Sequence, residues 1–166
     1  KQGYDVTGVY MKNWSEESMG GKFAKYCPWR RDVADVKAVC RILKIPVKVY
    51  NFEKEYNRKV ISYFFNEEKR GLTPNPDIVC NREIKFGLFL KRALADGADF
   101  IATGHYARNK TIDKKQLTLD GVREIKGQRS IVKSQMLLQA EDKNKDQTYF
   151  LCLLNQKQLA RSLFPL

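Results

Sequence analysis

Short β-branched segments alternate with segments of helical periodicity along much of this chain, and this alternation limits the fold more than any other feature. The β-branched segments are five to seven residues long, as strands are. Between them, apolar residues recur three and four positions apart, as on one face of a helix. This order is typical of an α/β fold with a parallel sheet and helices on its faces. We expect strands at 4–10, 47–52 and 99–103 and helices around 36–43, 56–71 and 81–95.

The pattern changes between Asn109 and Ser134, where polar and β-branched residues alternate and turn signals stand at Asp120–Gly121 and Gly127. This change predicts an antiparallel β-hairpin insert. The insert carries five Lys and two Arg against three acidic residues, which is a net +4 of the chain's +12. It is therefore a candidate RNA-facing surface, and a merely solvated hairpin is an equal alternative.

The charge of the whole chain favours a polyanionic partner. There are 31 Lys and Arg against 19 Asp and Glu, and such an excess draws nucleic acid through counterion release. An acidic membrane surface also fits the charge, but no apolar run is long enough to span a bilayer. We therefore expect nucleic acid and no membrane partner, with a solvated basic surface as the alternative. At 166 residues the chain is long enough for one compact core.

The four cysteines are scattered, no two form a C-x-x-C pair, and the chain has one histidine. We therefore expect reduced thiols, with neither a metal site nor a disulfide framework. Cys40 and Cys152 lie among apolar residues and are expected to be small buried side chains. Cys27, in a polar loop, is expected to be exposed and to lack an activating neighbour.

Cys80 is the best candidate nucleophile. It ends the segment Thr73–Cys80, in which two prolines argue against a regular helix or central strand and indicate a shaped loop. A helix is expected to begin near Asn81, and its unpaired N–H groups and dipole would stabilise a Cys80 thiolate. Asp77 in the same loop could act as a general acid or base, or could cap the helix.

The single histidine, His105, follows the predicted strand 99–103, and ligands bind at the carboxyl ends of strands in open parallel sheets. Gly104 beside it permits a nucleotide to approach the backbone closely. A hydrolase dyad of Cys80 and His105 is conceivable, but no Asn or Asp partner in a hydrolase signature accompanies it.

Four strings, GVYMKNW, TPNPDIVCNREIKF, IATGHYAR and KDQTYFL, occur in this order and together cover most of the chain. They resemble the bacterial and mitochondrial tRNA-specific 2-thiouridylases, and the second string is highly specific. The resemblance implies a Rossmann-like PP-loop ATP pyrophosphatase fold. It implies an enzyme that uses ATP, with Mg²⁺, to adenylate the C2 oxygen of the wobble uridine of tRNA before sulfur replaces that oxygen. It also implies a persulfide sulfur that reaches the enzyme from a sulfur-relay donor protein.

Site residues follow from the same resemblance. Cys80 resembles the catalytic nucleophile and Asp77 its acid–base neighbour. Residues 1–141, including the basic insert 109–134, resemble part of the catalytic domain, and residues 142–166 the start of a helical tRNA-binding region. The adenine-nucleotide contacts would be Met11 and Gly104, and the tRNA contacts Asn75, Pro76, Asp77, His105, Lys145, Asp146 and Gln147.

Two features of the family are expected outside this sequence. The phosphate-cradling loop Ser-Gly-Gly-x-Asp-Ser is expected before Lys1, and the second cysteine, which carries the persulfide, is expected beyond Leu166. We therefore interpret the chain as a fragment of the enzyme.

The sequence leaves alternatives open for both the cellular location and the function of the protein. The long basic insert resembles the mitochondrial or eukaryotic branch, so we expect a mitochondrial protein, with the cytoplasm as the alternative. Another ATP pyrophosphatase-type synthetase would share the fold but need neither Cys80 nor the charge. A non-catalytic RNA-binding module of the same fold is the second alternative function.

Overall fold

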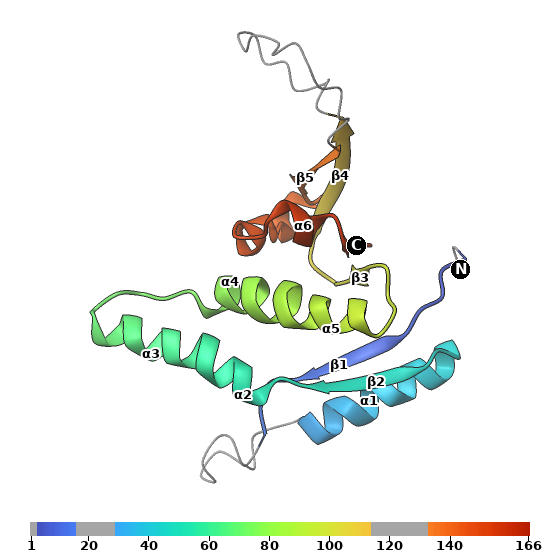
Figure 1. Ribbon diagram of the computed structural model, residues 1–166, viewed down its shortest axis with the longest axis horizontal. Coiled ribbons are helices and arrows are strands. Elements are labelled where there is room, and N and C mark those ends of the chain that lie inside the picture. Colours follow the sequence, from blue (N-terminus) through green and yellow to red (C-terminus); the bar gives the residue numbers. More distant parts are fainter. Residues whose placement is uncertain (1–2, 16–28, 114–132) are drawn as a thin grey trace. The chain divides into compact units, whose positions relative to one another are not determined.

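The computed structural model describes residues 3–15, 29–113 and 133–166, which form two compact units, residues 1–76 and 77–166 (Figure 1). Each unit holds a pair of parallel strands together with helices. This arrangement confirms the predicted α/β class with parallel strands. No helix in the described ranges is long and apolar enough to cross a membrane.

The first unit is built on two parallel strands, β1 (Gly8–Lys12) and β2 (Val47–Asn51), paired from Gly8 opposite Val47 to Lys12 opposite Asn51. Helix α1 (Trp29–Leu43) connects them and lies along the sheet (Figure 1). After β2 the chain forms one continuous helix in three stretches: α2 (Glu53–Tyr56), the π-helical η2 (Asn57–Ile61) and α3 (Ser62–Lys69). Gly71, with φ of +74°, follows the end of this helix, as predicted.

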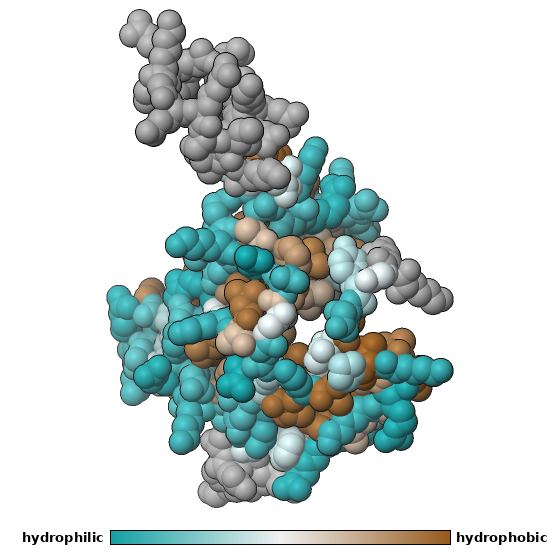
Figure 2. Space-filling view, turned by 45° about the vertical axis from the view of Figure 1, so that its right-hand side comes forward, coloured by the Kyte–Doolittle hydropathy of each residue, from teal (hydrophilic) through white to brown (hydrophobic). Residues whose placement is uncertain are grey.

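Helix α1 approaches β1 at a glycine. A Cβ atom at Gly8 would collide with the Sγ atom of Cys40, so only glycine allows this contact. Cys40 is buried as predicted, whereas Val39 and Leu43, which share its helical face by spacing, are 53% and 60% exposed. The helix therefore buries only a narrow stripe of this face against the two-stranded sheet. Figure 2 shows such hydrophobic side chains at the surface among hydrophilic ones.

The second unit begins within a continuous helix, one residue after its start, and continues into short strands. The helix comprises α4 (Pro76–Cys80), the π-helical η3 (Asn81–Phe89) and α5 (Leu90–Ala95). Strand β3 (Ile101–Ala102) pairs in parallel with β6 (Ser162–Leu163), and β4 (Ala107–Asp113) pairs antiparallel with β5 (Lys133–Gln139). Three short helices lie between β5 and β6: the 3₁₀ helices η5 (Lys143–Lys145) and η6 (Thr148–Leu151), and α6 (Gln156–Leu159).

The buried centre of the second unit includes Ile84 and Phe86 from η3 and Leu151 from η6, each at most 1% exposed. Residues 142–166 thus share a core with the helix that carries Cys80. The boundary expected after residue 141 does not separate compact units here, because the structure divides between residues 76 and 77. The expected difference in role between 1–141 and 142–166 stays a prediction.

Several predicted boundaries were wrong. The first strand runs from residue 8 to 12 rather than 4 to 10, and the strand predicted at 99–103 has only two paired residues. The region 142–166, expected to be helical, forms only short helices and the strand β6. The antiparallel pairing that flanks the basic insert is confirmed. Its turn signals, and the basic residues Lys114, Lys115, Lys126 and Arg129, lie outside the described residues.

Candidate functional site

The helix that carries Cys80 starts earlier than the sequence predicts. Pro76 is its first residue and Asp77 lies in its first turn, where proline costs no hydrogen bond and a carboxylate complements the helix dipole. Only the first part of the segment 73–80 is therefore a loop. Cys80 ends α4 and continues directly into η3, so the predicted position of its thiol before a helix N-terminus was wrong.

The thiol of Cys80 is buried, with 7% of the residue exposed. Burial raises the pKa of Cys80 above its ordinary value, the positive charge of Lys85 opposes that rise, and the negative charge of Asp77 adds to it. Cys80 is therefore held mainly as the neutral thiol, and Lys85 is the group that favours its thiolate. Of the other cysteines, Cys152 is exposed, contrary to prediction, and Cys27 lies outside the described residues.

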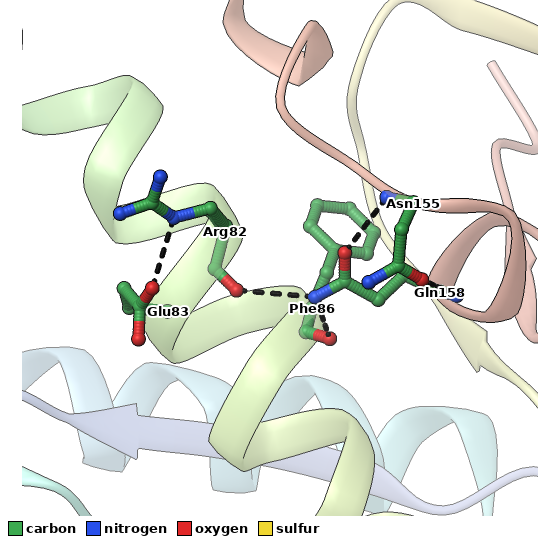
Figure 3. A network of polar contacts seen from close by, with 5 residues as sticks. All are labelled: Arg82, Glu83, Phe86, Asn155 and Gln158. Atoms are coloured by element: carbon green, nitrogen blue, oxygen red, sulfur yellow. Dashed lines mark hydrogen bonds and ion pairs between the residues drawn. The ribbon is translucent and has the colours of Figure 1, made fainter.

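Gly87 and Gln158 both lie against backbone carbonyl groups of the π-helical stretch that follows Cys80. A Cβ atom at Gly87 would lie 2.8 Å from the carbonyl oxygen of Arg82, so a larger residue would push this turn apart. The Gln158 amide donates hydrogen bonds from Nε2 to the carbonyl oxygens of Arg82, at 3.2 Å, and Phe86, at 2.9 Å (Figure 3). Its Oε1 accepts from Asn155 N in a capping box at the start of α6. Helix α6 therefore fixes the turn that follows Cys80.

Asn81, the neighbour of Cys80, ties the same helix to η6. It is 2% exposed and donates from Nδ2 to the carbonyl oxygen of Phe150 at 3.0 Å. Its Oδ1 has no hydrogen-bond partner among the described residues. Because η6 directly follows Lys145–Gln147, Asn81 couples the position of the cysteine to that of the predicted tRNA contacts.

His105 lies just beyond β3, in a loop packed on the aromatic core. Its Nδ1 is 2.9 Å from Thr103 Oγ1, and its ring centroid is 5.7 Å from that of Phe86 and 6.3 Å from that of Phe164. Burial, with a smaller contribution from the charge of Lys85, lowers the pKa of His105 to about 4. The imidazole is therefore neutral at physiological pH. The described residues contain no hydrogen bond between His105 and Cys80, so the hydrolase dyad gains no support.

Gly104, next to His105, is exposed. A Cβ atom there would meet only Leu166 Cδ1 at 3.6 Å, an ordinary contact, so the protein itself does not require glycine at this position. The exposed backbone leaves room for a ligand at the carboxyl end of β3. Met11 is half-buried near the end of β1, opposite Tyr50 in the first unit.

Lys145 is the last residue of η5, and Asp146 and Gln147 connect it to η6 and hold the loop of His105. Gln147 donates from its backbone N to the carbonyl oxygen of Tyr106 at 2.9 Å and accepts from Tyr106 N on its Oε1 at 3.1 Å. The Lys145 ammonium lies 5.3 Å from the centre of the Tyr106 ring and 3.9 Å from a carboxylate oxygen of Asp142. Gln147 therefore forms a two-way clamp on Tyr106.

Asp146 is engaged within the protein. Its Oδ2 accepts from Thr148 Oγ1 at 2.6 Å and its Oδ1 from Ala140 N at 2.9 Å. The hydrogen bond from Thr148, followed by that from Ala140, lowers the pKa of Asp146 below its ordinary value. No hydrogen bond from Gln147 Nε2 occurs within the part of the chain that the structure describes, so this donor and the Lys145 ammonium are the groups best able to face a ligand.

Within the second unit the charges of Asp77 and Lys85 act on Cys80, and Lys85 also acts on His105, whose ring packs on Phe86. Gln147 joins the segment Lys145–Gln147 to the His105 loop. Asn75 precedes α4 and Pro76 opens it. Three residues of this arrangement were not predicted. Lys85 and Asn81 give no periodic signal, because a π turn departs from the α-helical repeat, whereas Gln158 stands three residues after Asn155, a readable capping-box signature.

The fold and the site define an α/β protein with parallel strand pairs that places a buried cysteine, a lysine and a neutral histidine near the carboxyl end of a strand. The sequence model of the tRNA methyl transferase HUP domain matches residues 1–166. The chain belongs to this family.

Curated relatives match over the whole chain. It is 43% identical over 166 residues to the tRNA-specific 2-thiouridylase MnmA of Flavobacterium johnsoniae, covering 100% of this chain and 38% of that protein. It is 48% identical over 166 residues to the proteins of the same name from Nitrosomonas eutropha and Staphylococcus saprophyticus, again covering 100% of this chain and 40% and 39% of those proteins. The chain thus spans about two fifths of the length of the curated relatives it matches, and these relatives are bacterial.

Proposed function

We propose that the protein to which this chain belongs is a tRNA 2-thiouridylase, which activates C2 of the wobble uridine with ATP and then replaces its oxygen by sulfur. The observation that carries this proposal is identity of 43–48% across all 166 residues to proteins named tRNA-specific 2-thiouridylase. The net charge of +12 fits a polyanionic substrate such as tRNA. A synthetase that acts on a small or uncharged molecule would not need this charge.

Cys80 would be the nucleophile and Asp77 the acid–base group. They lie three positions apart in one helix, so both side chains point to the same side of α4. Because burial favours the neutral thiol, Cys80 stays protected from adventitious oxidation until it is deprotonated. Asn75, Pro76 and Asp77 would meet the target base at the start of this helix.

ATP, with Mg²⁺, would supply the adenyl group that turns the uridine C2 oxygen into a leaving group. Met11 and Gly104 would contact the nucleotide. Each lies near the carboxyl end of a parallel strand, β1 and β3 respectively, and the backbone at Gly104 is exposed, as a close nucleotide contact requires. Mg²⁺ at nucleotide sites commonly keeps several waters and binds phosphate oxygens, and we propose that arrangement here.

His105, Lys145, Asp146 and Gln147 would form the tRNA contact. The neutral His105 suits hydrogen bonding to a base or ribose rather than pairing with phosphate. Lys145 would supply a positive charge to the contact. Asp146 would support it indirectly, by accepting hydrogen bonds from Ala140 N and Thr148 Oγ1 that hold the segment in place. A sulfur-relay protein would bring the persulfide sulfur, and the second cysteine would lie outside this sequence. We also propose a mitochondrial location, supported by the basic insert, with the cytoplasm as the alternative; imaging of the tagged full-length protein would decide.

The experiment is tRNA thiolation by the full-length protein and its Cys80→Ser variant, read by mass spectrometry of tRNA nucleosides. Cys152→Ser is the matched control, because Cys152 is exposed and outside the proposed site. We expect Cys80→Ser to abolish 2-thiouridine while folding and tRNA affinity stay nearly unchanged, and Cys152→Ser to behave as wild type. Thiolation retained by Cys80→Ser would refute the role of Cys80. Wild type that binds tRNA but never thiolates it, with ATP and sulfur donor present, would favour the RNA-binding module.

A further inference from the structure

Lys85 is a half-buried cation on the π-helical stretch η3. Glu83 is the only carboxylate in that stretch, and it forms an ion pair with Arg82, Nε to Oε1, at 2.9 Å (Figure 3). Among the described residues, no carboxylate forms an ion pair with Lys85. The Lys85 ammonium is therefore available to another anionic group.

The π turn brings Lys85 next to Cys80. The two residues stand five positions apart. In an ordinary α-helix, residues at this spacing point to different sides. In a π turn, where hydrogen bonds join residues i and i+5, they lie closer together. The positive charge of Lys85 lowers the pKa of both Cys80 and His105. Phe86, the next residue, packs on the His105 ring and fixes the backbone at this point.

We propose that Lys85 is a positioning residue of the Cys80 site whose ammonium group stabilises the negative charge of the Cys80 thiolate. Loss of the thiol proton to solvent then leaves an ion pair in place of a bare buried anion. The π turn is what gives a lysine of this helix access to the sulfur. Gly87 leaves room for the Arg82 carbonyl, and Gln158 donates to two carbonyl oxygens of the same helical stretch. This inference rests on the proposed nucleophilic role of Cys80 and adds the group that makes the nucleophile available.

Other ionisable groups near the sulfur do not replace Lys85. Asp77, on α4, opposes the thiolate, and His105 beyond β3 is neutral. On the packed helices η6 and α6, the titratable side chains are Tyr149 and Lys157, and both residues are exposed. Lys85 is therefore the only cation of the described residues that acts on the Cys80 thiol.

The test is the pH dependence of Cys80 alkylation by iodoacetamide in the full-length protein, followed by mass spectrometry of the Cys80 peptide. Lys85→Met removes the charge and keeps a long apolar side chain, Lys85→Arg restores the charge, and Lys91→Met removes an exposed charge from the same continuous helix. The midpoint of the profile reports the thiol pKa, whereas the plateau at high pH reports access to the sulfur. A change of packing alone would move the plateau and leave the midpoint.

We expect Lys85→Met to shift the midpoint upward and to slow alkylation below it by about three- to tenfold, because a favourable charge is lost. Lys85→Arg should recover most of the rate, and Lys91→Met should match wild type. An unchanged midpoint in Lys85→Met overturns the proposal, as does a Lys85→Arg profile like that of Lys85→Met. If Lys85→Met does not fold, Lys85→Gln replaces it: an upward shift of the midpoint supports the proposal, and an unchanged midpoint overturns it. The readout needs no tRNA, so it separates failure of this inference from failure of the thiolation proposal.

Discussion

Gln158 offers the sharpest test of how the site is held, because one side chain makes three hydrogen bonds to two elements. Its amide donates to the carbonyl oxygens of Arg82 and Phe86, and its Oε1 accepts from Asn155 N. The contacts with Arg82 and Asn155 are exposed and contribute about 0.5 kcal/mol each. The Phe86 carbonyl is partly buried, and leaving it unpaired costs about 1–2 kcal/mol. We therefore expect Gln158→Ala to lower the free energy of unfolding by about 2–3 kcal/mol.

Two further variants separate hydrogen bonding from side-chain size. Gln158→Glu keeps the acceptor for Asn155 N but replaces the donor by a carboxylate that faces two carbonyl oxygens, so it should destabilise at least as much as alanine at pH 7. Protonation restores one O–H donor, so the loss should shrink as the pH falls through the raised pKa of that carboxyl group. Lys157→Ala, at an exposed neighbouring position, should cost less than about 0.5 kcal/mol.

The assay is chemical denaturation of the full-length protein, monitored by a probe in the second unit, with melting curves as a check. A Gln158→Ala variant as stable as Lys157→Ala would refute the reasoning, since it would mean that the π turn does not depend on these hydrogen bonds.

Three other predictions test separate parts of the structure. Lys44 has φ of +55° after α1, so Lys44→Gly should stabilise the full-length protein by about 1 kcal/mol in chemical denaturation; no gain would contradict the strain. The pKa of His105 is lowered from 6.5 to about 4, so the unfolded chain takes up a proton first, and stability should fall as the pH drops from about 6.5 towards 4. In chemical denaturation at several pH values, the free energy of unfolding of His105→Asn should fall less steeply with decreasing pH than that of wild type. An equal fall would argue against the buried position of His105. Asp146→Ala combined with Gln147→Ala should lower thiolation at subsaturating tRNA more than it lowers the melting temperature, because the clamp on Tyr106 is lost; a large fall in melting temperature with an unchanged rate per folded molecule would make these residues purely structural.

The sequence predicted the α/β class because strands and helices differ in period, and period survives in a single sequence. It misplaced the start of the Cys80 helix because two prolines suggest a loop, whereas Pro76 occupies the one helical position where proline is favoured. It also assigned Cys152 to a buried face on the basis of apolar neighbours, although Cys152 follows a short 3₁₀ helix in which that inference has little force. Local composition therefore predicted element type better than element boundary.

In the candidate site, too, features set by neighbouring residues in the sequence could be predicted, whereas contacts between residues far apart in the sequence could not. Motif strings located Cys80 and His105, but the link between them runs through Lys85, Phe86 and a change of helical pitch. We expect that pitch to depend on Gln158, more than seventy residues further along the chain, whose amide donates to carbonyl groups of the π turn. Gln158 would therefore influence the environment of the Cys80 thiol without contacting it. Its hydrogen bonds to the helix would determine whether Lys85 lies beside the sulfur or points away from it. On this reasoning, substitutions at Gly87 and Gln158 should alter the pKa of Cys80 through Lys85, and the alkylation profile would report that coupling directly.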